Sequence, residues 1–119
     1  MAPCTGTFGS VTAPKLIKVQ ATSTDKKAVY SLTVVVLPRD NDEMVFEHFV
    51  YSRTALENGT AAWDLEPSRI YKMALIADRA VEVTTTIDLP NRQIFNSKCS
   101  SAGPGLVGVW TLPTRRVAS

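Results

Sequence analysis

Few side chains in this sequence are of the types that catalyse reactions. His48 is the only histidine, and it lies in the aromatic segment 44–53 rather than beside a candidate nucleophile. The sequence contains no Ser-His-Asp set, no paired carboxylates in an apolar stretch, no glycine-rich phosphate loop and no CxxC spacing. A single histidine in such a segment is more often structural than a general base. We therefore expect a non-enzymatic protein that uses no cofactor.

The acidic run at 40–43 contains oxygen ligands of the kind that Ca²⁺ prefers, from Asp40, Asp42 and Glu43. It lacks the spaced ligands and the glycine of a dedicated calcium loop, so we interpret it as a solvated loop. Asn58-Gly59-Thr60 matches a glycosylation sequon, but Asn-Gly is also the dipeptide that tight turns require. We expect a turn at this position.

Cys4 and Cys99 lie near the two ends of the chain, in surroundings rich in Gly, Ser and Thr. They could form a disulfide that joins the two ends, but one pair in a chain of this size is weak evidence for an oxidising compartment, so we favour two free thiols. Residues 1–7 have neither the basic nor the apolar region of a signal peptide. Either a signal was removed or never present, or the protein is made and assembled in a cytoplasm, and Met1 favours the cytoplasm.

The composition is that of one globular domain. With 119 residues, 45% of them hydrophobic and 20% charged, the chain is long enough to bury a core without metals or disulfides. A net charge of +2, with lysines and arginines scattered along the chain, argues against nucleic acid as a partner. We interpret the pair Arg115-Arg116 as a solubilising end. No apolar run is long enough to cross a bilayer, so we expect no membrane contact.

Six segments have the alternation, or the β-branched and aromatic composition, that is typical of strands. They are residues 15–22, 28–37, 44–53, 60–65, 71–77 and 81–89. In the second of these segments we expect one face to be buried, formed by Tyr30, Leu32, Val34 and Val36. No stretch of eleven residues has a helical period. The sequence therefore predicts an all-β protein, either an antiparallel sandwich or a barrel.

The connection between the fourth and fifth of these segments contains the most specific pattern. Leu65, Pro67 and Tyr71 are spaced so that the Leu ends one strand in the core, the Pro stops that strand, and the Tyr hydroxyl points back to the backbone. On this pattern, residues 15–90 resemble a fibronectin type III domain or the wider immunoglobulin-like group. The resemblance implies a sandwich that binds or scaffolds other proteins. The chain lacks the tryptophan that this family usually carries on its second strand.

We expect the sandwich to occupy residues 15–90, preceded by an N-terminal arm over 1–14 and followed by a C-terminal extension over 91–119. The extension continues past the point where such a sandwich is complete, and it ends in an apolar segment. A segment of this kind pairs with the free edge of its own domain or with that of a neighbouring subunit. The side chains expected at this interface are Phe8, Ile94, Phe95, Leu106, Val107, Val109 and Trp110.

These expectations favour a structural protein of a large assembly. A virion component of a virus or bacteriophage, such as a decoration, cement or coat-associated protein, fits them best, with copies of itself or a major capsid-type protein as partner. The alternative is a secreted or surface-displayed module that recognises a protein or glycan through loops 38–43 and 54–59. A formed bridge between Cys4 and Cys99 would favour this alternative.

Overall fold

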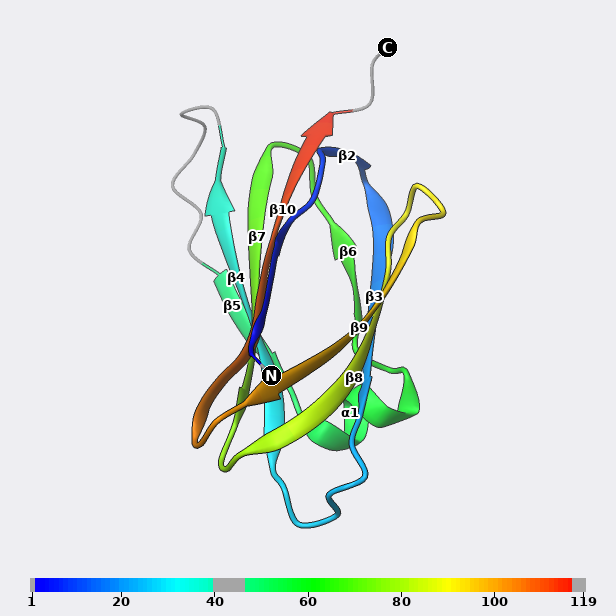
Figure 1. The fold of residues 1–119 in the computed structure, drawn as a ribbon. Helices are drawn as coiled ribbons and strands as arrows, with labels where there is room; N and C mark the ends of the chain where they lie inside the picture. Colours follow the sequence, from blue (N-terminus) through cyan, green and yellow to red (C-terminus); the bar gives the residue numbers. More distant parts are fainter. Residues whose placement is uncertain (1, 40–46, 117–119) are drawn as a thin grey trace.

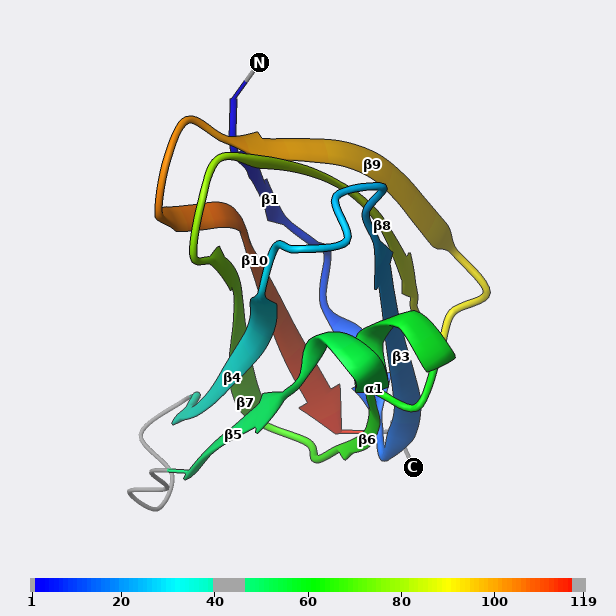
Figure 2. The ribbon, with the colours of Figure 1, turned by 90° about the horizontal axis from the view of Figure 1, so that it is seen from below.

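The computed structural model describes residues 2–39 and 47–116. Two β-sheets pack face to face as a sandwich, with one short helix among the described residues (Figure 1, Figure 2). The elements in chain order are β1 (Cys4–Thr7), β2 (Val11–Ala13), β3 (Lys15–Thr22), β4 (Tyr30–Pro38), β5 (Glu47–Tyr51), α1 (Arg53–Asn58), β6 (Ala62–Leu65), β7 (Arg69–Ala77), β8 (Val81–Asp88), β9 (Ile94–Ser101) and β10 (Gly105–Arg116). The prediction of an all-β sandwich is confirmed at this level.

The larger sheet has six strands. Its path runs β1-β10-β7-β4-β5, and β2 pairs with β10 beyond the end of β1. β10 is therefore paired on both sides, antiparallel with β7 on one side and parallel with β1 and then β2 on the other. The expectation of a purely antiparallel sandwich is wrong for this sheet, because the N-terminal residues run in the same direction as β10. A two-residue period indicates that a segment is a strand but not the direction of its partner.

The smaller sheet has four antiparallel strands in the order β6-β3-β8-β9. β8 and β9 form a hairpin that lies between β7 and β10 in the chain. The chain thus leaves the larger sheet after β7, contributes this hairpin to the smaller sheet, and returns to the larger sheet beside β7 (Figure 1).

The core lies between the inward faces of the two sheets. The residues of β4 that were predicted to face inward are all buried: Tyr30, Leu32, Val34 and Val36. On β5, Phe49 and Tyr51 also face inward, and both rings contact Trp63 of β6 with centroids 5.5 Å apart. These contacts hold the edge strand of the larger sheet against the edge strand of the smaller one.

The connection from β6 to β7 has the geometry expected of a tyrosine corner. The Tyr71 hydroxyl accepts a hydrogen bond from the Glu66 backbone N–H at 2.7 Å, and Leu65 is fully buried. Thr114 of β10 adds a second link, since its hydroxyl donates to the Glu66 carbonyl oxygen at 2.6 Å and accepts from the Arg69 N–H at 3.0 Å. The corner is therefore attached to a strand that the sequence had placed outside the domain.

Replacing Tyr71 by Phe is expected to lower the free energy of unfolding by about 1–2 kcal/mol, because the Glu66 N–H loses its acceptor. Urea unfolding followed by tryptophan fluorescence measures this change. Burial raises the pKa of Tyr71, so its contribution to stability is complete below about pH 10 and is lost as the pH rises through the folded-state pKa. The variant should accordingly lose less stability above pH 10 than the parent. Equal stability of the two proteins at pH 7 would contradict the assigned hydrogen bond.

The two ends of the described chain are integral to the sandwich. The segment 1–14, expected as an arm, contains β1 and β2, and Val11 and Ala13 are buried in the core. The segment 91–119, expected as an extension, contains an edge strand of the smaller sheet and a strand inside the larger one. This differs from a sandwich confined to 15–90, because β1 and β2 pair only with β10 among the described residues. Residues 2–39 and 47–116 thus form one structural unit.

Helix α1 occupies a segment that the sequence indicated as a loop. Ser52 caps its start, where the hydroxyl oxygen accepts a hydrogen bond from the Ala55 N–H at 3.3 Å. Gly59 ends it in the left-handed region, with a φ of 73°. Asn58-Gly59 therefore terminates a helix rather than forming a tight turn between strands. Six residues are too few for a helical period to be recognised in the sequence.

Candidate interaction surface

The outward face of the larger sheet carries mostly apolar and threonine side chains, and we term it the outer apolar face. Cross-strand pairing aligns the residues that we include in it in three rows, and the half-buried Leu37, Ile70 and Pro113 continue the same side of the sheet beyond the third row. The first row is Leu106, Ile76 and Ser31; the second is Thr5, Val109, Ala74, Thr33 and Val50; the third is Thr7, Thr111, Lys72, Val35 and His48. None of them is buried, and Lys72 is the only permanently charged residue in the three rows.

Several side chains of the outer apolar face are substantially open to solvent. Val50 is 57% exposed, Ile76 43% and Leu106 40%. Strands lie about 4.8 Å apart and residues on one face about 6.8 Å apart along a strand, so three rows over five strands cover on the order of 500 Å². Contiguous apolar patches on monomeric proteins rarely exceed a few hundred Å². The outer apolar face is therefore a candidate site of protein contact.

The outer apolar face ends at an unpaired strand edge. In the part of the chain that the structure describes, β5 pairs with β4 alone. Its second edge therefore presents backbone N–H and C=O groups that can extend the sheet. Val50 and His48 are the residues of β5 that belong to the outer apolar face. A partner on this face could thus contact both apolar side chains and a strand edge.

Three of the predicted interface residues lie elsewhere, near the outer strand of the smaller sheet. The ring of Phe8, in the connection between β1 and β2, packs against Phe95 of β9 with centroids 4.8 Å apart. Phe95 pairs with the buried Ile87 and so shares its inward direction, whereas the neighbouring Ile94 points outward. Phe95 and Ile94 are both exposed and Phe8 is half-buried. The structure thus brings Phe8 and Phe95 together and directs Ile94 to the opposite side of the sheet.

Val107 and Trp110, also predicted at the interface, lie in the core instead. Val107 is 0% exposed and Trp110 5%. The indole of Trp110 lies over Gly108, where an added Cβ would stand 2.5 Å from the ring. A register irregularity between Leu106 and Gly108 interrupts the alternation of β10, so the sequence did not separate its two faces. Leu106 and Val109 are the members of the predicted set that belong to the outer apolar face.

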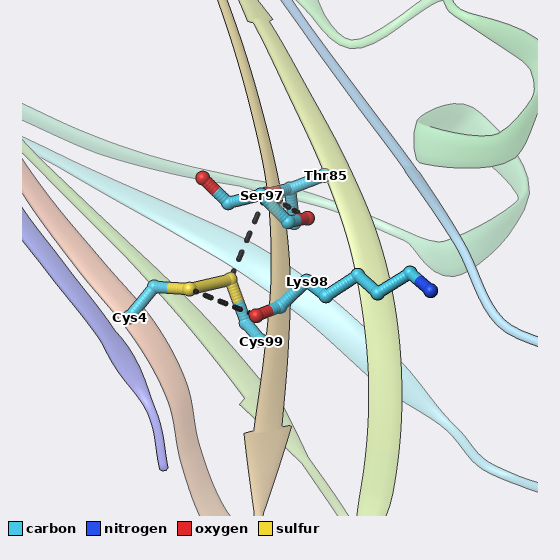
Figure 3. The surroundings of a disulfide bond; sticks show 5 residues. All are labelled: Cys4, Thr85, Ser97, Lys98 and Cys99. Carbon is cyan, nitrogen blue, oxygen red and sulfur yellow. Dashed lines mark hydrogen bonds between the residues drawn. A yellow bond between two sulfur atoms is a disulfide. The ribbon is translucent and has the colours of Figure 1, made fainter. Parts of the chain in front are cut away.

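Cys4 and Cys99 form a disulfide, with Cα atoms 5.2 Å apart (Figure 3). The bond joins β1 of the larger sheet to β9 of the smaller one. Cys99 is fully buried and Cys4 half-buried. Beside it, the Ser100 N–H donates to the carbonyl oxygen of Ala2 at 3.3 Å. The structure thus contains the bonded state rather than the two free thiols that the sequence favoured.

The weak calcium candidates, Asp40, Asp42 and Glu43, lie outside the described residues. Within 2–39 and 47–116, no three His, Cys, Asp or Glu side chains cluster as a metal site would require. His48 is exposed on β5. In the same two ranges, no helix has the length and apolar character needed to cross a membrane.

The titratable groups with perturbed pKa values serve the fold. Burial raises the pKa of Tyr30, Tyr51 and Tyr71, so these hydroxyls stay neutral and act as hydrogen-bonding groups. Hydrogen bonds from Arg79 lower the pKa of the Asp78 carboxyl, which lies in the exposed turn after β7. None of these five residues belongs to the three rows of the outer apolar face.

Much of the outer apolar face, including Val35, Val50, Ala74 and Ile76, was not predicted from the sequence. A signal was present in β4 and β7, where residues 33–37 (TVVVL) and 73–77 (MALIA) are apolar at nearly every position. Such runs are typical of strands covered on both faces. The alternation rule assigns every second residue of these strands to the core and makes no prediction about the residues between them, which form the outward face.

Comparisons of the chain with protein families, with curated proteins and with solved structures found no match.

Proposed function

We propose that this protein is a non-enzymatic structural component of a large protein assembly, in which copies of the chain bind one another through the outer apolar face. The observation that carries the proposal is the extent of that face, three rows of mostly apolar and threonine side chains that together span five strands. A virion is the assembly that the sequence favours.

The position of Lys72 suits a second copy of the chain as the partner. Lys72 lies in the third row, while the first and second rows have no charged residue. A two-fold axis along the second row places the first row of one copy over the third row of the other. The two lysines then lie about 14 Å apart on opposite sides of the axis, so their like charges do not meet, and their long side chains can reach toward solvent.

The area of the outer apolar face fits a repeated contact. Its extent, on the order of 500 Å², is below the roughly 800 Å² per partner of a standard stable interface. A single such contact is weak. Several of them acting together within one assembly give a much higher overall affinity. The face thus suits a subunit that is held by more than one neighbour.

The disulfide supports an assembly that is exposed to an oxidising medium. Disulfides persist on virion surfaces and in secreted proteins, and they are rare in a reducing cytoplasm. The bridge between Cys4 and Cys99 therefore also favours the second candidate, a secreted or surface-displayed recognition module. Of the loops assigned to that module, the segment 54–59 lies in helix α1 and its C-terminal cap, with Asn58 exposed.

We further propose that the sandwich is a variant of the immunoglobulin-like fold. Adjacent strands β4-β7-β10 in one sheet, β3 beside β6 in the other, and the corner at Tyr71 support this relation. The variation is the β8-β9 hairpin, which is inserted between β7 and β10 and lies beside β3. Such a fold is common among proteins that bind other proteins, which is consistent with the proposed role.

The assembly proposal is tested by placing a carboxylate on the outer apolar face. Ile76→Glu and Leu106→Glu alter cross-strand neighbours in the first row. Each variant is expected to raise the dissociation constant for self-association by at least about tenfold, because the contact would bury an unpaired charge. Sedimentation velocity over a range of concentrations measures this change, and circular dichroism checks that the variants are folded.

Leu16→Glu is the matched control, since Leu16 is an exposed apolar residue on the outward face of the smaller sheet. It should associate like the parent. A parent that stays monomeric at millimolar concentration, or a Leu16→Glu variant that is equally impaired, would rule out the outer apolar face as the contact. Loss of association in Ile94→Glu alone would place the contact at β9 instead. A glycan on Asn58 of the native protein, found by mass spectrometry, would favour the secreted recognition module.

A further inference from the structure

A hollow of about 240 Å³ lies at the end of the sandwich remote from the disulfide. It is formed where β2, the start of β3, the end of β10 and the chain just after β8 meet. The polar and charged residues that line it are Ser10, Thr12, Lys15, Asn91 and Arg115. The hollow thus joins segments from both sheets and from both ends of the chain.

The charges around this hollow are positive. Lys15 and Arg115 line it, and no carboxylate side chain does so among the described residues. In that same part of the chain the ion pairs join Arg53 to Glu57, Arg69 to Glu66 and Arg79 to Asp78, so neither Lys15 nor Arg115 is neutralised by one of them.

Ser10 organises the polar wall of the hollow. Its carbonyl oxygen accepts a hydrogen bond from Nη1 of Arg115 at 3.1 Å, which restricts the direction of that guanidinium group. Its hydroxyl oxygen accepts from Nη1 of Arg39 at 2.6 Å. Because this oxygen accepts from Arg39, the hydroxyl proton of Ser10 is available to donate to a ligand. A guanidinium group has five N–H donors, so Arg115 keeps donors beyond the one that Ser10 uses.

We propose that this hollow binds a small oxyanion, a carboxylate or phosphate group, between Lys15 and Arg115, with the Ser10 hydroxyl as a further donor. Pockets for whole cofactors or drug-sized ligands measure about 300–1,000 Å³, which is more than this hollow offers. At about 30 Å³ per water molecule, it holds roughly eight waters, which is room for one anionic group and part of its hydration shell. The site is independent of self-association through the outer apolar face.

The test is a titration of the ¹⁵N-labelled protein with sodium phosphate and, separately, with sodium acetate, at ionic strength held constant with sodium chloride. Saturable shifts of the amide signals of Ser10, Thr12 and Asn91 are expected for at least one anion. Lys15→Ala and Arg115→Ala should each raise its dissociation constant about tenfold, since each removes a charge-assisted hydrogen bond. Binding of acetate identifies a carboxylate site, and binding of phosphate alone identifies a phosphate site.

Lys26→Ala and Lys27→Ala are the controls, because they remove the same charge from the connection between β3 and β4, at the opposite end of β3 from Lys15. Both should bind the anion as the parent does. The proposal is overturned if neither anion gives saturable shifts, or if the controls weaken binding as much as Lys15→Ala and Arg115→Ala. The spectra of the variants show directly whether each is folded. Because sedimentation measures self-association separately, this site and the proposed assembly role can fail independently.

Discussion

Reduction of the disulfide between Cys4 and Cys99 is expected to lower the free energy of unfolding by about 3–5 kcal/mol. The two cysteines are separated by 95 positions in the chain, so the bond closes nearly the whole polypeptide into one loop. Chain-entropy arguments give about 4.7 kcal/mol at 25 °C for a loop of roughly 100 residues. For a domain of ordinary stability, about 5–15 kcal/mol, this is a large fraction of the total.

Urea unfolding with and without a phosphine reductant measures the effect of the bond. Since the chain contains two cysteines and both are in this disulfide, the reductant has no other target. A Cys4→Ala, Cys99→Ala double variant should resemble the reduced parent and should not respond to the reductant. If the parent unfolds at the same urea concentration in both states, the bond contributes nothing to stability and the chain-entropy estimate fails.

The stability lost on reduction of the disulfide should differ from one part of the molecule to another. β1 is an edge strand that pairs only with β10 among the described residues, and the disulfide is its covalent link to the smaller sheet. Breaking that link leaves the strand held by four paired residues. Hydrogen exchange of the β1 amides should therefore accelerate more on reduction than exchange of the amides of β4, which is paired on both sides.

The parts of the fold that depend on local pattern could be predicted from the sequence. β4 and β8 were found because their inward residues alternate and turn-forming residues follow them. The corner at Tyr71 was found because its residue types and spacing are fixed by local geometry. The parallel pairing of β1 and β2 with β10 could not be found, because it joins residues about 100 positions apart and leaves no local signal.

The candidate surface was only partly predictable for a similar reason. Leu106 and Val109 were recognised as contact residues because an apolar segment in the C-terminal region was conspicuous. In β4 and β7 both faces are apolar, and alternation cannot show which face lies inside. The choice is made by the opposing sheet, which buries Val34 and Met73 and leaves Val35 and Ile76 on the outward face.

Trp110→Ala is expected to lower the free energy of unfolding by about 3–5 kcal/mol, the usual cost of removing a buried aromatic side chain. Trp110 is 5% exposed, and its ring fills the space left by two glycines, Gly6 of β1 and Gly108 of β10. Because neither glycine has a side chain, removing the indole leaves a large cavity between the two strands. No neighbouring side chain at either glycine can fill it.

Leu106→Ala, on the same strand, is the matched control for Trp110→Ala. Leu106 lies on the outward face and is 40% exposed, so its truncation should change the stability of the monomer by less than about 1 kcal/mol. Self-association should show the opposite order. Under conditions where both variants are folded, Leu106→Ala should weaken it more than Trp110→Ala does. These two readouts separate a core role for β10 from a role as an arm that binds a neighbour. If Trp110→Ala instead left unfolding unchanged and abolished association, β10 would have to be an arm bound to another subunit. Because β10 is paired on both sides and its inward face fills the core, we expect the opposite result: Trp110→Ala lowers the stability and does not abolish association.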